Sequence, residues 1–392
     1  MDVDTAVAEV AAAVGLAEGE AGIRDILAAL LTAEPAAVRE VARLAELPVP
    51  IVAAVCGELR KRGIVDTQRP VRLTAGGRDA ALAATGLASP AGYSLRADCA
   101  SCGGRGVVIP SELAGLANDL QDAADGAPGA RAELDQTHCT VATKISRVLR
   151  MHAARALAGQ RILLLGDDDL IAVAIARFAA WTGSPAMIRE LTVVDADPDV
   201  LDWIGQQTAG TGVSVRLEQH DLREPLPARL LGGYDVAATD PPYTVTGAEL
   251  FLSRAVSALA PALGRHVFFS FGARRPDETL AVQQDIAAMG LVVRSLSAGF
   301  NSYLGAGVLG GTSNLYHLRS TATARPLIEG RYDGPLYTAD GRAAVRPYRC
   351  ATCKSVHEVG QGARWPQIGA LQQAGCPDCG GSVFRPMPLV AR

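Results

Sequence analysis

Short apolar runs and longer amphipathic stretches alternate over the second half of the chain. In chain order the predicted strands are RILLLG, ELTVVDAD, VSVRLEQHD, YDVAATD and HVFFSFG, and LVVRSLSAGF and NLYHLRS follow them. Such runs are typical of buried strands, and the amphipathic stretches between them are typical of helices that cover both faces of a parallel sheet. The pattern therefore predicts a doubly wound α/β domain over residues 156–330.

The first part of the chain has a helical period. GIRDILAALL, AAVREVARLAE and PIVAAVCGELRKRG are predicted helices, with Pro50 in the first turn of the third, and IVDTQRPVRLT is predicted to form two short strands before a further helix. This order resembles a winged-helix domain over residues 1–95. Arg60, Lys61 and Arg62 could contact DNA, but they could also complement a helix C-terminus in a docking or dimerisation module, which we favour.

Residues 96–155 and 331–392 lack this alternation of strands and helices. Residues 96–155 are predicted to be a connector that contains a Gly- and Asp-rich loop and ends in the amphipathic helix TKISRVLRMHAARAL. The connector contains the C-x-x-C pair Cys99 and Cys102, with His138 and Cys139 downstream. These residues could form a second zinc site, or the pair could be a reduced structural one.

Residues 331–392 hold the last four cysteines of the chain. Cys350 and Cys353, and Cys376 and Cys379, form two C-x-x-C pairs. Paired spacing of this kind predicts a zinc ribbon. We expect the zinc to be structural, because four thiolates leave no open position for a substrate.

Composition narrows the class of protein. The 392 residues are 49% hydrophobic and 20% charged, which predicts two or three ordinary globular domains. The formal net charge of -4 provides no general attraction to nucleic acid or to an anionic membrane. The acidic N-terminal sequence lacks the features of a signal peptide, and arginines interrupt the longest apolar stretches. We therefore expect a cytoplasmic protein without a membrane segment.

Candidate chemistry lies where the predicted strands end. The first strand ends at Gly166, and Asp167, Asp168 and Asp169 follow it. Ligands of a doubly wound sheet bind at the carboxyl ends of its strands. Three carboxylates would repel a pyrophosphate, which argues against NAD or ATP and favours a cationic ligand. The alternative is that one aspartate caps the next helix and the others are solvated.

Single acidic residues follow the next two strands. Asp195 ends the second strand, where a carboxylate can accept the ribose hydroxyls of a nucleoside. Asp221 follows the third strand, where many such folds hold an adenine amino group. Each of them could equally be a helix cap or a turn residue.

The sequence Asp240-Pro241-Pro242-Tyr243 follows the fourth strand. Two prolines cannot continue a sheet, so they direct the chain out of the strand. The Asp240 carboxylate could then orient or deprotonate an amine, and the Tyr243 ring could stack on a base or cover a cation. A rigid turn without a ligand is the alternative.

GDDDL after the first strand and DPPYT after the fourth, preceded by a winged-helix region, resemble the bis-aminopropyl spermidine synthases that make branched-chain polyamines. The resemblance covers about residues 20–330. It implies a Rossmann-like sheet of the class I methyltransferase and spermidine synthase type. We also expect a homodimer. The implied reaction moves an aminopropyl group from decarboxylated S-adenosylmethionine to an amine of a polyamine such as spermidine, and releases methylthioadenosine.

The resemblance also implies roles for individual residues. Carried over by motif, Asp169 and Asp240 hold the attacking amine, and Gly166, Asp195 and Asp221 surround the nucleoside. Beyond the motif match, we expect Tyr243 at the amine and Asp167, Asp168 and Pro241 at the nucleoside. Asp135 and Gln136 resemble a family element before the core, whereas the cysteine-rich tail departs from the family pattern.

Two other functions stay open. An amino-methyltransferase acting on a nucleic-acid base fits, since Asp-Pro-Pro-Tyr also resembles the motif of those enzymes. The second open function is that of a regulator that binds DNA through its winged helix and senses a ligand with its α/β domain. The acidic first loop, the lack of Gly-x-Gly after the first strand and the negative net charge favour aminopropyl transfer over nucleic-acid partners.

Overall fold

The protein is described here by a computed structural model. The residues described are 3–16, 18–45, 47–85, 101–304, 311–337, 346–359, 363–365 and 368–387. Contacts group the chain into a larger unit, Met1–Ala130, Thr137–Pro241 and Ala248–Tyr332, and a smaller unit, Arg131–Gln136, Pro242–Gly247 and Asp333–Arg392. The division into four parts at residues 95, 155 and 330 stays a prediction.

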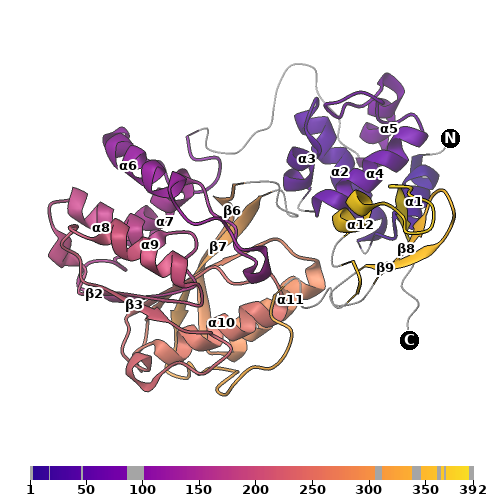
Figure 1. The fold of residues 1–392 in the computed structure, drawn as a ribbon. Helices are drawn as coiled ribbons and strands as arrows, with labels where there is room; N and C mark the ends of the chain where they lie inside the picture. The colour runs from indigo at the N-terminus through magenta and orange to yellow at the C-terminus, as the bar shows by residue number, and fades with distance from the viewer. Residues whose placement is uncertain are drawn as a thin grey trace. The chain divides into compact units, whose positions relative to one another are not determined.

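Within the described residues, a seven-stranded sheet is the centre of the larger unit (Figure 1). Its order is β3-β2-β1-β4-β5-β7-β6; the first five strands are parallel, and β7 runs antiparallel to both of its neighbours. The bounds are β1 Arg161–Leu165, β2 Glu190–Asp195, β3 Val215–Gln219, β4 Val236–Thr239, β5 His266–Phe271, β6 Leu291–Ser302 and β7 Thr312–Ser320. The predicted α/β sheet is therefore confirmed.

The strand order reverses between β1 and β4, which pair with each other in parallel register. Leu165 at the end of β1 lies opposite Thr239 at the end of β4, and Thr239 Oγ1 donates to the Leu165 carbonyl at 2.8 Å. The acidic loop follows β1 and the Pro-Pro loop follows β4. The topology thus brings together two motifs that are about 70 residues apart, at the position where ligands of such sheets bind.

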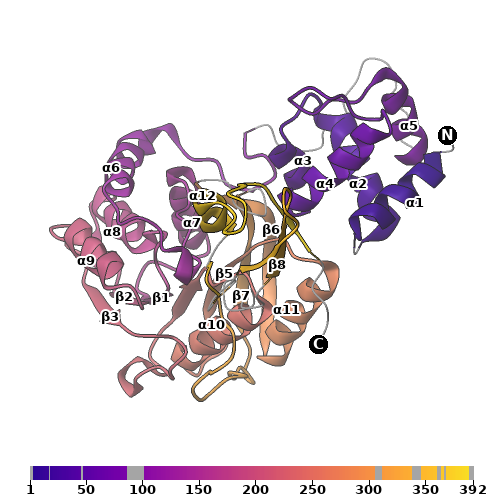
Figure 2. The ribbon, with the colours of Figure 1, turned by 45° about the vertical axis from the view of Figure 1, so that its right-hand side comes forward.

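Helices cover both faces of this sheet (Figures 1 and 2). On one face lie α6 Ala114–Asp125, α7 Val141–Ala153, α8 Ile171–Trp181 and α9 Pro198–Thr208, and on the other lie α10 Val245–Ala258 and α11 Pro276–Ala288. The segment predicted to be only a connector thus contains α6. Its buried residues Leu116, Leu120 and Ala123 recur at helical spacing, which gives it an apolar stripe despite its polar composition.

The N-terminal helices have a hydrophobic core of their own, with Val10, Ile26, Leu30 and Leu59 among its buried residues. The helices are α1 Val3–Val14, α2 Gly19–Ala33, α3 Val38–Leu44, α4 Val49–Lys61 and α5 Ala75–Thr85. The sequence analysis did not predict α1. The predicted hairpin is present only as two isolated antiparallel bridges, Ala36 with Val71 and Val65 with Leu73.

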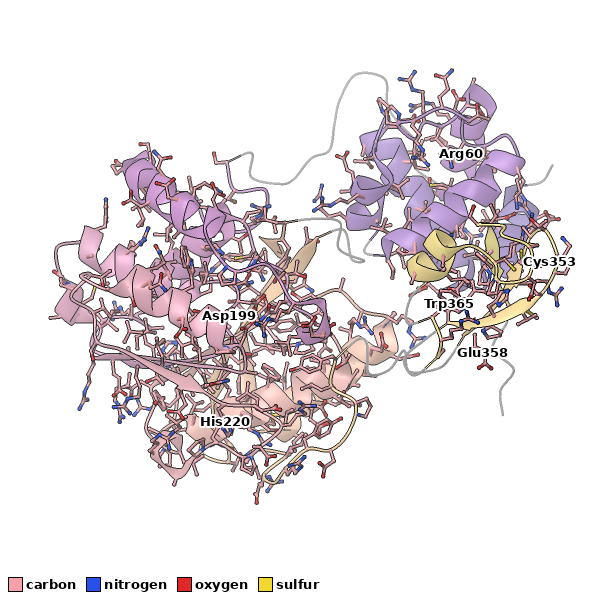
Figure 3. All side chains as sticks on the ribbon, viewed as in Figure 1. Arg60, Asp199, His220, Cys353, Glu358 and Trp365 are labelled. Carbon is pink, nitrogen blue, oxygen red and sulfur yellow. The ribbon has the colours of Figure 1, made fainter. Side chains whose placement is uncertain are left out.

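The three basic residues at the end of α4 have local partners. Arg60, labelled in Figure 3, donates through Nε to the Asp66 carbonyl at 2.9 Å. Lys61 and Arg62 both pair with Glu58, at 2.5 and 2.9 Å. These contacts favour a structural role at the helix C-terminus over contacts with DNA.

The tail forms a small three-stranded sheet of order β10-β8-β9. The elements are β8 Arg346–Cys350, β9 Val356–Val359, α12 Ile368–Ala374 and β10 Phe384–Pro386. Its buried cluster is small, with Cys350, Val359, Leu371, Cys376 and Phe384 as its buried members and Trp365 packed against them; Figure 3 labels Trp365 on this module. A core of this size rarely folds without a metal or a disulfide.

Hydrogen bonds hold residues 328–336, which follow β7. The fully buried Arg254 of α10 donates to the carbonyls of Leu222, Ile328 and Gly330 at 2.7 to 2.9 Å. Within the smaller unit, Thr244 Oγ1 donates to the Leu336 carbonyl at 3.0 Å, and Thr246 Oγ1 to the Pro335 carbonyl at 3.1 Å. No helix in the described part of the chain combines the length and apolarity needed to cross a membrane.

Candidate active site

The acidic loop turns sharply after β1. Gly166 has a φ of 71°, which favours glycine. Asp167 caps α8, because its carboxylate accepts from the backbone N–H groups of Ile171 and Ala172 at 2.7 and 2.8 Å. Burial raises the pKa of Asp167 to about 8 despite these two bonds. Of the two interpretations of the acidic loop, Asp167 therefore fits the one in which an aspartate caps the following helix.

The segment before α7 holds the other two aspartates of the loop. Asp168 Oδ2 accepts from the Thr137 backbone N–H at 3.0 Å, and Asp169 Oδ1 accepts from the Cys139 backbone N–H at 2.5 Å. Lys144, 1% exposed, donates from Nζ to the Asp169 carbonyl oxygen at 2.5 Å. Asp169 therefore has a fixed side chain and a fixed backbone.

Arg147 of α7 joins the two motifs. Nη1 donates to Asp169 Oδ2 and Nη2 to Asp240 Oδ2, both at 2.7 Å. Nε donates to Asn301 Oδ1 at 2.8 Å, and Nη2 also lies 3.0 Å from the Tyr303 hydroxyl. The Arg147 side chain is 8% exposed, so these ion pairs are buried. The two aspartates predicted to hold the attacking amine thus share one guanidinium.

The two aspartates differ in their affinity for a proton. Burial raises the pKa of Asp240 to about 6; Arg147 opposes this effect and the Asp169 charge adds to it. Burial also acts to raise the pKa of Asp169, but Arg147 and Lys144 outweigh it and leave that pKa below its usual value. The pair therefore combines an ionised carboxylate with a carboxyl that titrates closer to neutrality, as general acid–base chemistry requires.

A pocket lies at this point of the sheet. It is lined by Arg147, Met151, Leu164, Gly166, Asp167, Asp169, Ile171, Ala238, Thr239, Asp240, Phe268, Ser270 and Leu315. Gly166, Asp167, Asp169 and Asp240 are the predicted site residues that line it. Its walls are otherwise largely apolar, so water that would screen the charged groups is partly excluded.

Asp195 and Asp221 have contacts of their own. The Asp195 carboxylate, which is buried, accepts from the backbone N–H groups of Asp167 and Asp197, both at 2.8 Å, and so joins the loops after β1 and β2. Asp221 pairs with Arg223 at 2.7 Å, and its side chain is 38% exposed. Asp168, Asp195 and Asp221 are not among the residues that line the pocket. Their roles around a nucleoside stay predictions.

The remaining predicted residues lie after β4 and before α7. Pro241 is buried directly after Asp240, whereas Tyr243 is half-buried and belongs to the smaller unit. Asp135 and Gln136 are also in that unit, and Gln136 Oε1 accepts from the Arg131 backbone N–H at 2.8 Å. The predicted role of Tyr243 at the amine is not tested by these contacts.

The sequence analysis missed Arg147 and its neighbours Asn301 and Tyr303. A signal for Arg147 was present, because Lys144 and Arg147 share the helix face of the buried Val148 and Met151. A cation on the apolar face of a helix needs a buried partner. Asn301 and Tyr303 gave no comparable signal, since they reach the site from the far end of β6.

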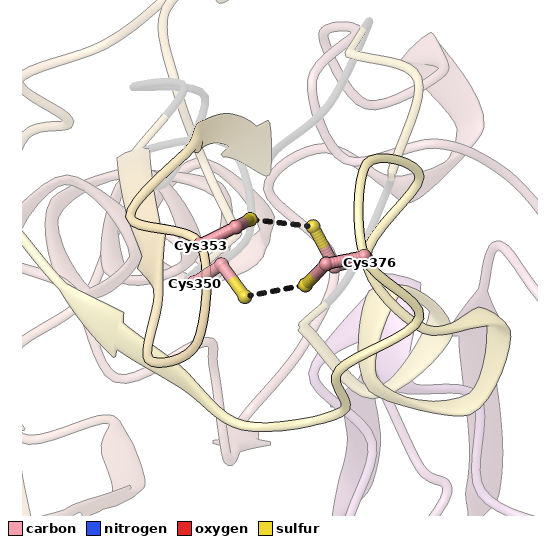
Figure 4. Close-up of side chains that lie close together, drawn as sticks. Cys350, Cys353 and Cys376 are labelled. Atoms are coloured by element: carbon pink, nitrogen blue, oxygen red, sulfur yellow. Dashed lines mark hydrogen bonds between the residues drawn. The ribbon is translucent and has the colours of Figure 1, made fainter.

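The four cysteines of the tail converge. Their Sγ atoms all lie within 4.8 Å of one another, with 3.6 Å between Cys350 and Cys379 and 3.6 Å between Cys353 and Cys376 (Figure 4). A tetrahedral zinc with Zn–S bonds of about 2.3 Å would place its sulfurs about 3.8 Å apart. The cluster thus fits a zinc ion, whose coordination shell the four thiolates would fill.

The second possible zinc site is not formed within residues 101–304. The His138 ring nitrogens lie 2.7 Å from the Asp168 carbonyl and 3.0 Å from the Pro128 carbonyl, and Cys139 is buried beside Lys144. His138, Cys139 and Cys102 do not gather into a metal-ligating set in this part of the chain. Cys99 lies outside the described residues.

Known proteins are similar in sequence to much of this chain. The family model of the branched-chain polyamine synthase A C-terminal domain matches residues 115–321, more than half of the chain. An uncharacterized protein of Methanocaldococcus jannaschii is 31% identical over 94% of this chain and 89% of its own length. The N(4)-bis(aminopropyl)spermidine synthase of Thermococcus kodakarensis is 29% identical over 67% of this chain and 72% of its own length.

A solved structure has the same architecture. The C9 mutein of the Thermus thermophilus branched-chain polyamine synthase, in complex with N4-aminopropylspermidine and 5'-methylthioadenosine, superposes with a TM-score of 0.69 at 25% identity. The match covers 86% of this chain and 97% of that one, and it bears out the predicted Rossmann-like fold class. The sequence and fold matches agree, and the chain therefore belongs to the branched-chain polyamine synthase A family.

Proposed function

We propose that the protein transfers an aminopropyl group from decarboxylated S-adenosylmethionine to an amine of a polyamine such as spermidine, and releases methylthioadenosine. The observation that carries this proposal is the buried pair of Asp169 and Asp240 at the end of β1 and β4 in a member of this family. A Thermus thermophilus relative binds N4-aminopropylspermidine and 5'-methylthioadenosine, which are a polyamine and the nucleoside product of such a transfer.

In the proposed reaction the amine nitrogen attacks the aminopropyl carbon next to sulfur. The C–N bond forms as the C–S bond breaks, the electron pair stays on sulfur, and the sulfonium becomes a neutral thioether. The amine proton passes to Asp240, whose pKa of about 6 lets it accept a proton and return it to solvent near neutral pH. Asp169, held ionised by Arg147, orients the amine.

The leaving group needs no help from the protein, because a sulfonium already carries positive charge. Catalysis by the chain is then alignment of nitrogen, carbon and sulfur in a pocket that excludes much of the water. In this proposal Tyr243 covers the amine, and the nucleoside lies among Gly166, Asp167, Asp168, Asp195, Asp221 and Pro241.

The carboxylates also select between donors. A donor that retains its carboxylate would place a negative charge near Asp169 and Asp240, whereas the decarboxylated donor presents only an amine there. The same argument favours a polycationic acceptor over a nucleic acid. We further propose that the cysteine cluster holds a structural zinc, and that the protein acts as a homodimer.

Product mass tests the proposal. Purified protein is incubated with spermidine and either decarboxylated or intact S-adenosylmethionine, and we expect spermidine to gain one or two aminopropyl groups with the decarboxylated donor only. Gain of a methyl group with the intact donor would instead establish an amino-methyltransferase. A parallel reaction with single-stranded oligonucleotides in place of spermidine distinguishes a base-modifying enzyme.

A further inference from the structure

We propose that Arg147 is a positioning residue that holds Asp169 and Asp240 as one unit and keeps this unit ionised for an incoming amine. Arg147 itself does not contact the reacting atoms in this view; it acts through the two carboxylates. The inference rests on the proposed function for the identity of the amine. It goes beyond that function because it says which residue of α7 keeps the two carboxylates ionised.

The hydrogen bonds of Arg147 fix its position. Its guanidinium donates in three directions, to Asp169, to Asp240 and to Asn301. Asn301 is 0% exposed and is fixed in turn, because its Nδ2 donates to the hydroxyls of Ser270 and Ser313 at 3.1 and 2.8 Å. The planar fork of an arginine can serve these acceptors together, whereas a lysine would offer one point charge.

The charges around the pair make a cation necessary. Two carboxylates buried side by side do not both stay ionised unless a positive charge compensates them, and otherwise one of them takes up a proton. The charged and titratable groups that face the pair come from three places. They are Arg147 and Lys144 from α7, the Cys139 thiol before α7, and Asp167 and Asp168 from the acidic loop. The Tyr303 hydroxyl donates to Asp240 Oδ2 at 2.5 Å.

Arg147 is the cation that contacts both carboxylates. Lys144 donates to the backbone carbonyl of Asp169 and lies 3.7 Å from the Cys139 sulfur, so it reaches one member of the pair through its backbone. Burial, together with the charges of Asp169, Asp195 and Asp240, raises the pKa of Asp168 well above its usual value, so Asp168 is the neighbouring carboxyl that takes up a proton. Loss of the Arg147 charge should therefore leave the pair with one proton bound at neutral pH.

Three variants test this role. Arg147→Gln removes the charge, Arg147→Lys keeps it without the fork, and Arg150→Gln removes a charge three residues further along α7. Arg150 donates to the Arg105 carbonyl at 2.7 Å and to the Ser297 hydroxyl, so it is a control matched in type and helix.

The acidic limb of the kcat/KM profile against pH is the first readout. We expect a midpoint near pH 6 for the wild type, in line with the pKa of Asp240. In Arg147→Gln the midpoint should move up by about one unit or more, so that kcat/KM at pH 6 falls at least about fivefold and recovers at high pH. Arg147→Lys should shift it less, and Arg150→Gln should leave it in place.

Proton release on binding spermidine is the second readout, and it needs no transfer. Titration calorimetry in buffers of different ionisation enthalpy counts the protons, and Arg147→Gln should release more of them at pH 7 than the wild type. Equal proton release together with an unshifted midpoint would overturn the role of Arg147. If the wild type makes no product but releases fewer protons than Arg147→Gln, the proposed transfer is refuted and the role of Arg147 is not. If the wild type binds no spermidine, both the proposed transfer and the role of Arg147 are refuted.

Discussion

Replacing Asp240 with asparagine is the most direct test of the proposed proton acceptor. Asp240 Oδ2 accepts from Arg147 Nη2 at 2.7 Å and from the Tyr303 hydroxyl at 2.5 Å, and the side chain is 11% exposed. Asparagine has the same shape and retains an oxygen that can accept both bonds. It cannot, however, take a proton from an ammonium group.

The effects on stability and on catalysis should differ in size. Hydrogen bonds to a charged group contribute about 1.5–3 kcal/mol and neutral ones about 0.5–1.5 kcal/mol, so the substitution weakens two bonds. Against this loss, the pKa of Asp240 is raised from 3.8 to about 6, mainly by burial, so the wild type loses stability as the pH rises through that range. The variant lacks this titration. Since the two effects oppose each other, we expect stability at pH 7 to change by less than about 2 kcal/mol, whereas turnover falls about 10²- to 10⁴-fold.

The assay pairs product mass with calorimetric binding of methylthioadenosine. Asp240→Asn should lose turnover and still bind the nucleoside within about threefold of the wild type, because Asp240 is assigned to the amine. Asp285→Asn on α11 is a matched control. Burial, and to a lesser extent the Glu249 charge, also raises the pKa of Asp285 to about 6. Asp285, however, is not among the residues that line the pocket. Loss of nucleoside binding in Asp240→Asn, or equal loss of turnover in both variants, would show that the assignment is wrong.

Three further changes have separate expected outcomes. Asp167→Ala removes both side-chain bonds at the start of α8 and should lower the free energy of unfolding by about 1–2 kcal/mol in a urea titration; no change would contradict the cap. Tyr303→Phe removes the 2.5 Å bond to Asp240 and should lower kcat/KM roughly tenfold with unchanged nucleoside binding, since one hydrogen bond is lost. Cys376→Ser should abolish the zinc found by elemental analysis, whereas Cys102→Ser should retain it, and zinc in equal amounts in both variants would refute the four-cysteine site.

Much of the fold follows from sequence periodicity. The strands β1, β2 and β5 are mostly apolar and are buried over almost their whole length, which is characteristic of strands covered on both faces. Periodicity was less informative where helices are short of large apolar residues. The buried positions of α6 and α1 are partly alanine, so their apolar stripes are weak in the sequence.

The site was predictable only in part, for a physical reason. Asp169 and Asp240 directly follow strands, so the topology of a parallel sheet is enough to bring them together. Arg147, Asn301 and Tyr303 meet them through tertiary packing of α7 and the end of β6, which no local pattern specifies. A charge on a buried helix face signals that a partner exists, but it does not identify that partner.

The hydrogen bonds from Thr244 and Thr246 to the carbonyls of Leu336 and Pro335 determine where the chain can be shortened. Thr244 follows the Pro-Pro loop directly, so these bonds brace the loop and the first turn of α10 from the C-terminal side. A gene truncated at residue 332 would remove this brace together with the zinc module, whereas one truncated after residue 337 would remove the module alone. In chimaeras built from this family, the exchangeable zinc module therefore begins after Tyr337.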